Sequence, residues 1–133
     1  MPYRVLEHTA DIGIEATAAD IPALFSEALR ATAAVILDGD PPDGVGEAAV
    51  AVEADDVETL LAEFLAEALW RFESTGDLPV SAELEVSETT AAGSFQTING
   101  VVVGGPAIKA VTYHQLSVER TGDVWRARVF FDV

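Results

Sequence analysis

Apolar residues recur at helical spacing in a segment that follows Asp20. Asp20 is a candidate N-cap, Pro22 lies in the first turn, and Gly39 with the Pro-Pro-Asp-Gly run beyond it ends the pattern. The positions that share one face are Ile21, Leu24, Phe25, Ala28, Leu29, Val35 and Ile36. This periodicity predicts an amphipathic helix whose apolar face lies in the core.

A second segment has the same period. It starts at Asp55 or Asp56, either of which can act as the N-cap, and it stops before Gly76. Its apolar positions are Val57, Leu60, Leu61, Phe64, Leu65, Leu69 and Phe72. The polar face lacks the lysines and arginines that are typical of a membrane-surface helix, so this segment also predicts a helix that packs on the core.

Most of the remaining chain alternates between apolar and polar residues, as half-buried β-strands do. Residues 82–87 are the clearest example, with Ala82, Leu84 and Val86 on one face. Asn99-Gly100 is a hairpin turn signal, and it predicts that strand Phe95–Ile98 pairs with Val101–Val103.

The end of the chain predicts another hairpin, in which residues 112–120 (TYHQLSVER) and 124–133 (VWRARVFFDV) flank a Thr-Gly-Asp turn. Helices in two places among hairpin-connected strands favour an α+β fold over a doubly wound parallel sheet. Residues 1–133 therefore predict a single domain with a mixed, largely antiparallel β-sheet and two amphipathic helices packed on it.

The absence of cysteine excludes disulfide frameworks and thiolate metal sites. The first residues lack the basic and apolar segments of a signal peptide, and no apolar run is long enough to cross a bilayer. We therefore expect a cytoplasmic protein without membrane contact.

The charge balance is strongly acidic, with 23 acidic against 7 basic residues and a net charge of -16. Strong direct binding to nucleic acid needs a basic surface, and only a small local patch is available here. In molar salt the Debye length falls to roughly 3 Å, which screens repulsion between surface carboxylates. Because the acids are spread along the chain, salt adaptation explains them better than docking on a basic partner.

The alternation of the two terminal strands places one aspartate of each on a polar face. The polar face of the last strand carries Arg126, Arg128, Phe130 and Asp132. The outward face of the strand near the start carries Asp11, Gly13 and Glu15. Asp11 and Asp132 would therefore meet if these two strands were neighbours.

Such a meeting would bring both side-chain carboxylates to the α-carboxylate of Val133. Like charges held that close are unfavourable unless a cation or a proton relieves them. Oxygen ligands alone suit Ca²⁺ or Mg²⁺ and not zinc. In the alternative interpretation, Asp11 shapes a turn and Asp132 is a solvated terminal residue.

The histidines and the single lysine are further candidates. His8 lies three residues before Asp11, and His114 falls in the predicted strand 112–120, but neither has convergent partners in the sequence, which favours structural roles. Lys109 would be suited to holding carboxylates or a partner's phosphate, unless it is an ordinary surface lysine. The Gly100–Pro106 run lacks the ending of a P-loop and precedes no helix, so we discount it as a phosphate site.

Three stretches of the chain resemble the archease family. They are HTADIGIEA at residues 8–16, IKAVTYHQLSV at 108–118 and the terminal WRARVFFDV at 125–133. The order of these motifs and of the two helices matches the family along the whole chain. The lysine-poor, acid-rich composition is what a halophilic archaeal member would have.

The resemblance implies an accessory protein, not an enzyme, that acts on the catalytic subunit of the GTP-dependent tRNA-splicing ligase. Such a protein promotes guanylylation of the ligase and its multiple turnover in tRNA processing. The metal-binding carboxylates of the family match Asp11 and Asp132, and Val133 supplies an oxygen. Lys109 matches a motif lysine of the same functional surface, which His8 and His114 are also expected to border.

Two other functions remain open at this point. One is a chaperone-like role for an RNA-modifying methyltransferase, which is also suggested for this family. The other is a metal-dependent hydrolase, for which the sequence offers carboxylates but no clear base.

Overall fold

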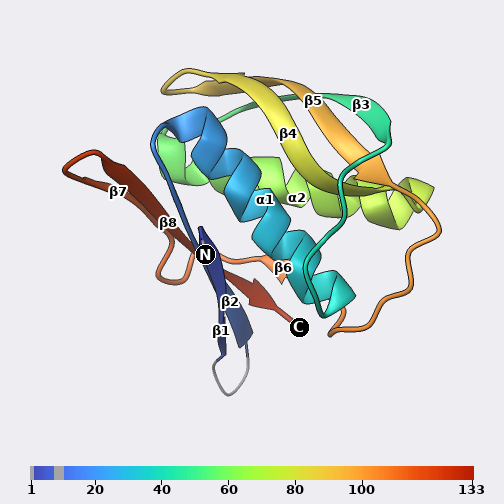
Figure 1. The fold of residues 1–133 in the computed structure, drawn as a ribbon. Helices are drawn as coiled ribbons and strands as arrows, with labels where there is room; N and C mark the ends of the chain where they lie inside the picture. The colour runs from blue at the N-terminus through green and yellow to red at the C-terminus, as the bar shows by residue number, and fades with distance from the viewer. Residues whose placement is uncertain (1, 8–10) are drawn as a thin grey trace.

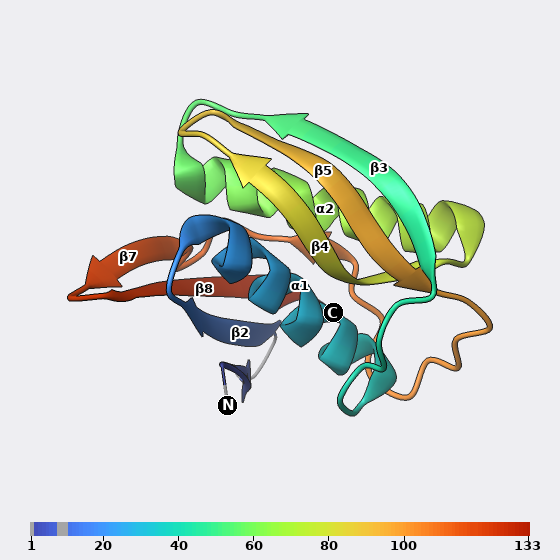
Figure 2. The ribbon, with the colours of Figure 1, turned by 45° about the horizontal axis from the view of Figure 1, so that its top comes forward.

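Helix α1 (Ile21–Leu37) lies between two β-sheets and forms the middle layer of the molecule together with α2 (Val57–Thr75). The computed structural model describes residues 2–7 and 11–133. Figure 1 shows the elements in chain order, and Figure 2 shows the helices between the sheets. A helix covered on both sides must be apolar around most of its surface. Accordingly, the buried residues of α1 include Ala31, Thr32 and Ala33 in addition to the predicted face.

The two sheets have no described strand in common. The first has the order β1-β2-β8-β6, with β7 also paired to β8, and its strands are β1 (Tyr3–Glu7), β2 (Asp11–Ala18), β6 (Ala110–Val111), β7 (Ser117–Thr121) and β8 (Val124–Asp132). The second has the order β3-β5-β4, and its strands are β3 (Gly46–Glu53), β4 (Leu78–Val86) and β5 (Thr90–Ile98). We call them sheet A and sheet B. Every pairing between these described strands is antiparallel.

The α+β prediction is confirmed, and the structure divides the strands into two sheets where the sequence predicted one mixed sheet. The physical reason lies in α1, whose two apolar sides each require cover. Alternation within a strand shows which side chains face inward, but it carries no information on which layer covers them.

Both predicted helices form where their capping residues lie. Asp20 accepts a hydrogen bond from the Ala23 N–H (2.8 Å) and Asp56 accepts one from the Thr59 N–H (2.8 Å). Gly76 ends α2 with φ 79°, a left-handed conformation that favours glycine. The left-handed cap of α1 is Asp38 (φ 57°), one residue before the predicted Gly39. Within the described ranges, neither helix is long and apolar enough to cross a membrane.

The predicted hairpin at Asn99-Gly100 is wrong. Strand β5 pairs with β4 and β3 instead, and the chain after Ile98 leaves the sheet. It crosses to the end of α1, where the N–H groups of Gly104 and Gly105 both donate to the Ile36 carbonyl (3.1 and 3.0 Å). These bonds satisfy a carbonyl that the helix end leaves free. Gly104 and Gly105 thus cap the end of α1, although they lie far from that helix in the sequence. Their sequence spacing gave no indication of this role.

We expect Gly105→Ala to lower the free energy of unfolding by about 2 kcal/mol, because a Cβ there would collide with the Val35 carbonyl oxygen. Urea unfolding followed by circular dichroism measures the change. Gly39→Ala is the matched control, since a Cβ at Gly39 meets nothing within 4 Å, and its effect should stay within about 0.5 kcal/mol. Equal stability of Gly105→Ala and the parent would contradict the proposed close packing.

Candidate functional site

Asp11 and Asp132 lie directly opposite each other across strands β2 and β8 of sheet A. Strand β6 continues the row, with Ala110 opposite Asp132, and the Lys109 N–H donates to the Asp132 carbonyl (2.8 Å). Ile14 is buried and Asp132 is exposed, as the alternation predicts, but Gly13 and Glu15 of the predicted outward face are buried. The fold therefore brings Asp11, Asp132 and the backbone of Lys109 together from three segments.

The pair fits a hard cation in its donor chemistry. Side chains opposite each other on antiparallel strands have Cβ atoms roughly 4.5–5.5 Å apart, a separation that two carboxylates can bridge through one ion. Among residues 2–7 and 11–133, no group of three or more histidine, aspartate or glutamate side chains is placed to hold a metal. Asp11 and Asp132 would thus supply only part of a ligand shell, and the α-carboxylate of the adjacent Val133, water or a partner would supply the rest.

Phe130 departs from the predicted polar face of β8, because its side chain is buried (1% exposed). The reason is Gly13, which lies opposite it in the register. A Cβ on Gly13 would be 2.6 Å from the Phe130 ring, so the missing side chain leaves the space that the ring fills. His114 packs edge-on against the same ring with a centroid distance of 6.0 Å. A small apolar cluster therefore lies beside the Asp11–Asp132 pair.

His114 does not lie in a strand, contrary to the sequence prediction. It occupies a turn between β6 and β7, where Gln115 has φ 53° and the His114 N–H donates to Thr112 Oγ1 (3.3 Å). The register of β6 with β8 ends before this turn, which forces the chain out of the sheet. His8 lies outside the described residues, and a functional role for either histidine stays a prediction.

Glu15 is the centre of an ion-pair cluster that sequence reasoning missed. Its side chain is 8% exposed and meets Arg128 Nη2 at 2.8 Å, Arg4 Nη2 at 3.1 Å and Arg126 Nε at 3.9 Å. The sequence alternation could have indicated this cluster. An antiparallel register that pairs Asp11 with Asp132 also pairs Glu15 with Arg128. The hydrogen bond from Arg128 is the largest of the effects that lower the pKa of the Glu15 carboxyl, and burial opposes it.

We expect Glu15→Gln to lower the free energy of unfolding by about 2–3 kcal/mol at pH 7, because it leaves three guanidinium groups close together without their counter-charge. The lowered pKa of Glu15 determines how its contribution to stability depends on pH. The stabilisation is complete above the ordinary carboxyl pKa of 4.5 and is lost as pH falls through the lower folded-state pKa.

The difference in unfolding free energy between the parent and Glu15→Gln should therefore shrink between pH 5 and pH 3, measured in urea at constant salt. The control is Glu119→Gln, an exposed residue opposite Arg126 that has the same change in charge. Its effect should be within about 0.5 kcal/mol. A Glu15→Gln effect equal to that of Glu119→Gln at pH 7 would show that burial of Glu15 has no energetic consequence.

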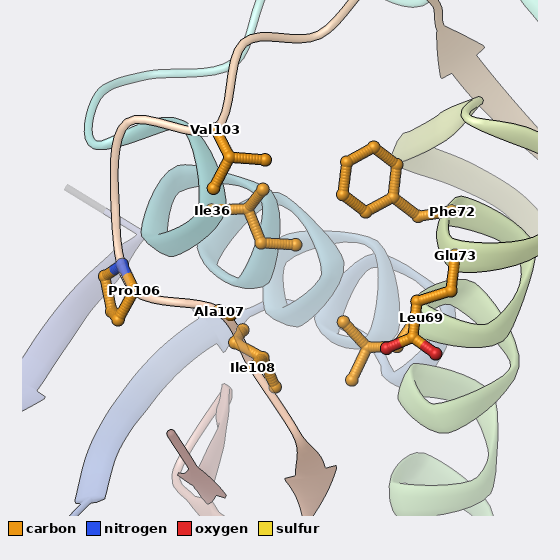
Figure 3. Close-up of a pocket in the computed structure, with 8 residues that line it drawn as sticks. All are labelled: Ile36, Leu69, Phe72, Glu73, Val103, Pro106, Ala107 and Ile108. Atoms are coloured by element: carbon orange, nitrogen blue, oxygen red, sulfur yellow. The ribbon is translucent and has the colours of Figure 1, made fainter.

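An apolar pocket of about 120 Å³ lies away from the aspartate pair, between the ends of both helices and the loop at residues 103–108 (Figure 3). Ile36, Leu69, Phe72 and Ile108 line it, and Glu73 stands at its wall. Sites for small molecules and cofactors are usually larger, roughly 300–1,000 Å³. The pocket is large enough for one apolar side chain and too small for a nucleotide.

The sequence profile of the Archease protein family (MTH1598/TM1083) matches residues 3–133. Protein archease of Methanosarcina mazei is 33% identical and aligns with 98% of this chain and 95% of its own. Protein archease of Methanopyrus kandleri is 32% identical, with 100% of both chains aligned.

Two solved structures are also similar. The solution structure of protein 1598 of Methanobacterium thermoautotrophicum superimposes with a TM-score of 0.79 at 22% identity, covering 99% of both chains, which shows a shared fold. The crystal structure of a Thermotoga maritima protein, described as an archease and possible chaperone, has a TM-score of 0.63 at 25% identity, covering 98% of this chain and 96% of its own. The profile match along nearly the whole chain, together with these relatives, shows that this protein belongs to the archease family.

Proposed function

We propose that this protein activates the GTP-dependent tRNA-splicing ligase by promoting guanylylation of the ligase and its multiple turnover. One observation carries the proposal: the register sets Asp11 opposite Asp132 at the end of the chain, with Lys109 bonded to Asp132 through the backbone. These are the positions at which the sequence resembles the archease motifs. Family membership supports the same assignment.

In this proposal Asp11 and Asp132 hold a divalent cation, Ca²⁺ or Mg²⁺, and Val133 contributes an oxygen. When bound, the cation would supply positive charge that attracts carboxylates or phosphates of a partner. The carboxylates lie at the ends of strands β2 and β8, where Asp132 is exposed and Asp11 is half-buried, and Lys109 on the neighbouring segment is also exposed. A partner can therefore reach the ligands directly, which suits an accessory protein that completes its metal shell on docking.

We assign the chemical step to the ligase and a non-catalytic role to this protein. The aspartate pair has ligands for a hard ion, and the nearby His114 ring packs against Phe130. A hydrolase would require a base positioned near the pair. Purified protein incubated with GTP and Mg²⁺ should release no phosphate above background, and release that disappears in Asp132→Asn would refute the accessory role.

The decisive experiment mixes the purified catalytic subunit of the ligase with labelled GTP and a divalent ion, with and without this protein. We expect more covalently guanylylated ligase and more rounds of RNA joining per ligase when the protein is present. An equal yield in both reactions would refute the proposal.

A second candidate is a chaperone-like role for an RNA-modifying methyltransferase. The observation that favours it is the description of the Thermotoga maritima relative as a possible chaperone, and the apolar pocket beside the exposed Val103 is a surface that such a role could use. In that case the protein would suppress aggregation of the methyltransferase in a light-scattering assay and leave ligase guanylylation unchanged.

A further inference from the structure

Three of the chain's six arginines converge on the buried carboxylate of Glu15. One arginine balances the charge of one carboxylate, so the cluster carries two positive charges more than Glu15 neutralises. The arginine side chains are also far more exposed than their partner, 65% for Arg4, 59% for Arg126 and 40% for Arg128 against 8% for Glu15. Glu15 thus anchors guanidinium groups whose other N–H donors face solvent.

We call Arg4, Arg126 and Arg128 the arginine surface. It lies on the same face of sheet A as the aspartate pair, because Arg128 and Asp132 share the parity of β8. They are four positions apart along the strand, roughly 13 Å. Both helices pack on the opposite face of sheet A (Figure 2), and on this face the turn that carries His114 packs on Phe130.

We propose that the arginine surface binds carboxylate side chains of the protein partner that contacts Asp11 and Asp132. The inference rests on the proposed function, which identifies that partner as the ligase. The arginine surface and the aspartate pair lie on one face, with Phe130 and the His114 ring between them, so a partner that spans this part of β8 contacts both. Arginine held in a fixed position binds a carboxylate through paired N–H donors, which sets orientation as well as attraction.

The distribution of charge on this face favours a folded protein over RNA as the occupant. Carboxylates lie at one end of the face, guanidinium groups lie at the other, and Glu119 stands opposite Arg126. A folded protein can place carboxylates opposite the guanidinium groups and cationic side chains or a shared metal opposite Asp11 and Asp132. A phosphodiester backbone has negative charge along its whole length, and the chain's net charge of -16 opposes its approach.

The first test is the double substitution Arg4→Gln with Arg126→Gln. It keeps the hydrogen bond of Arg128 to Glu15, so the fold should be retained, and urea unfolding checks this. We expect association with the immobilised ligase to slow about tenfold at low salt and to depend less on salt. The concentration that gives half-maximal guanylylation should rise by a similar factor.

Arg120→Gln is the matched control. Arg120 is an exposed arginine on the same hairpin, but it lies opposite Trp125 and therefore on the other face of the strand. Its association rate should equal that of the parent. Unchanged kinetics in the double variant, with a parent that does bind and stimulate the ligase, would overturn this inference alone. A parent that neither binds nor stimulates the ligase would overturn the proposed function and this inference together.

The second test asks whether carboxylates of the partner lie against the arginine surface. It uses a variant that keeps the positive charge of the replaced arginine. Lys109 is the only lysine of the chain, so Arg126→Lys adds a single ε-amine at the arginine surface. A carbodiimide, which joins amines to carboxylates, should link this lysine to aspartate or glutamate of the ligase, whereas Arg120→Lys should give only the links of the parent.

Absence of an added crosslink would overturn the proposal. So would a result in which Arg4→Gln with Arg126→Gln weakens binding of a labelled single-stranded RNA and leaves ligase binding intact.

Discussion

The combined substitution Asp11→Asn with Asp132→Asn is expected to reduce stimulation of ligase guanylylation by about 100-fold, and either single substitution by at least about tenfold. An asparagine keeps the size of the side chain and removes one negative charge. The two residues lie opposite each other in the register, so under the proposed function each substitution would remove a ligand from the same metal. The measurement is the amount of labelled guanylate bound to the ligase as a function of the concentration of each variant.

The same variants should bind Ca²⁺ or Mg²⁺ more weakly in isothermal titration calorimetry. Asp43→Asn with Asp123→Asn is the control, since it makes the same change in net charge at exposed positions outside the described site. Full stimulation by the Asp11 and Asp132 variants would exclude a role for the carboxylate pair. Loss of stimulation without loss of metal binding would point to a direct contact between these side chains and the ligase.

Phe64→Ala is expected to have the largest effect on stability, lowering the free energy of unfolding by about 3–5 kcal/mol. Phe64 of α2 lies between Phe25 of α1, with ring centroids 5.5 Å apart, and Phe95 of β5, with centroids 5.4 Å apart. All three side chains are fully buried. The substitution removes the ring that joins both helices to sheet B, and the cavity left behind cannot close without moving three elements.

Urea unfolding monitored by circular dichroism at constant salt measures this loss. Trp70→Ala on the same helix is the control, because Trp70 is a larger aromatic residue that is 58% exposed. Its effect should be below about 1 kcal/mol, since little apolar area returns to water. A similar effect for both variants would mean that burial does not determine the contribution of these aromatic residues.

Features that depend on residues close in sequence were predicted well. The caps at Asp20, Asp56 and Gly76 act through backbone groups within a few residues, and they mark helix boundaries in the sequence and in the structure alike. The shift of the α1 cap to Asp38 is a one-residue difference of the size expected at helix ends.

Features that depend on pairing between distant segments were predicted less well. Asn99-Gly100 has the composition of a hairpin turn. The segment that follows it nevertheless hydrogen-bonds to the end of α1 and does not pair with β5. His114 lies in a turn and not in the predicted strand, because the pairing of β6 with β8 ends before that position. A local sequence pattern does not show which pairing partner a segment will have, because the possible partners lie far away along the chain.

The candidate site shows the same division. The sequence by itself determined which side of its strand each aspartate faces, because alternation is a property of a single strand. Only the tertiary structure decided that β2 and β8 are neighbours in the register that joins Asp11 to Asp132, buries Glu15 among arginines and seats Phe130 over Gly13. The register is set by the packing of whole faces against α1 and the core, and such packing involves the entire chain at once.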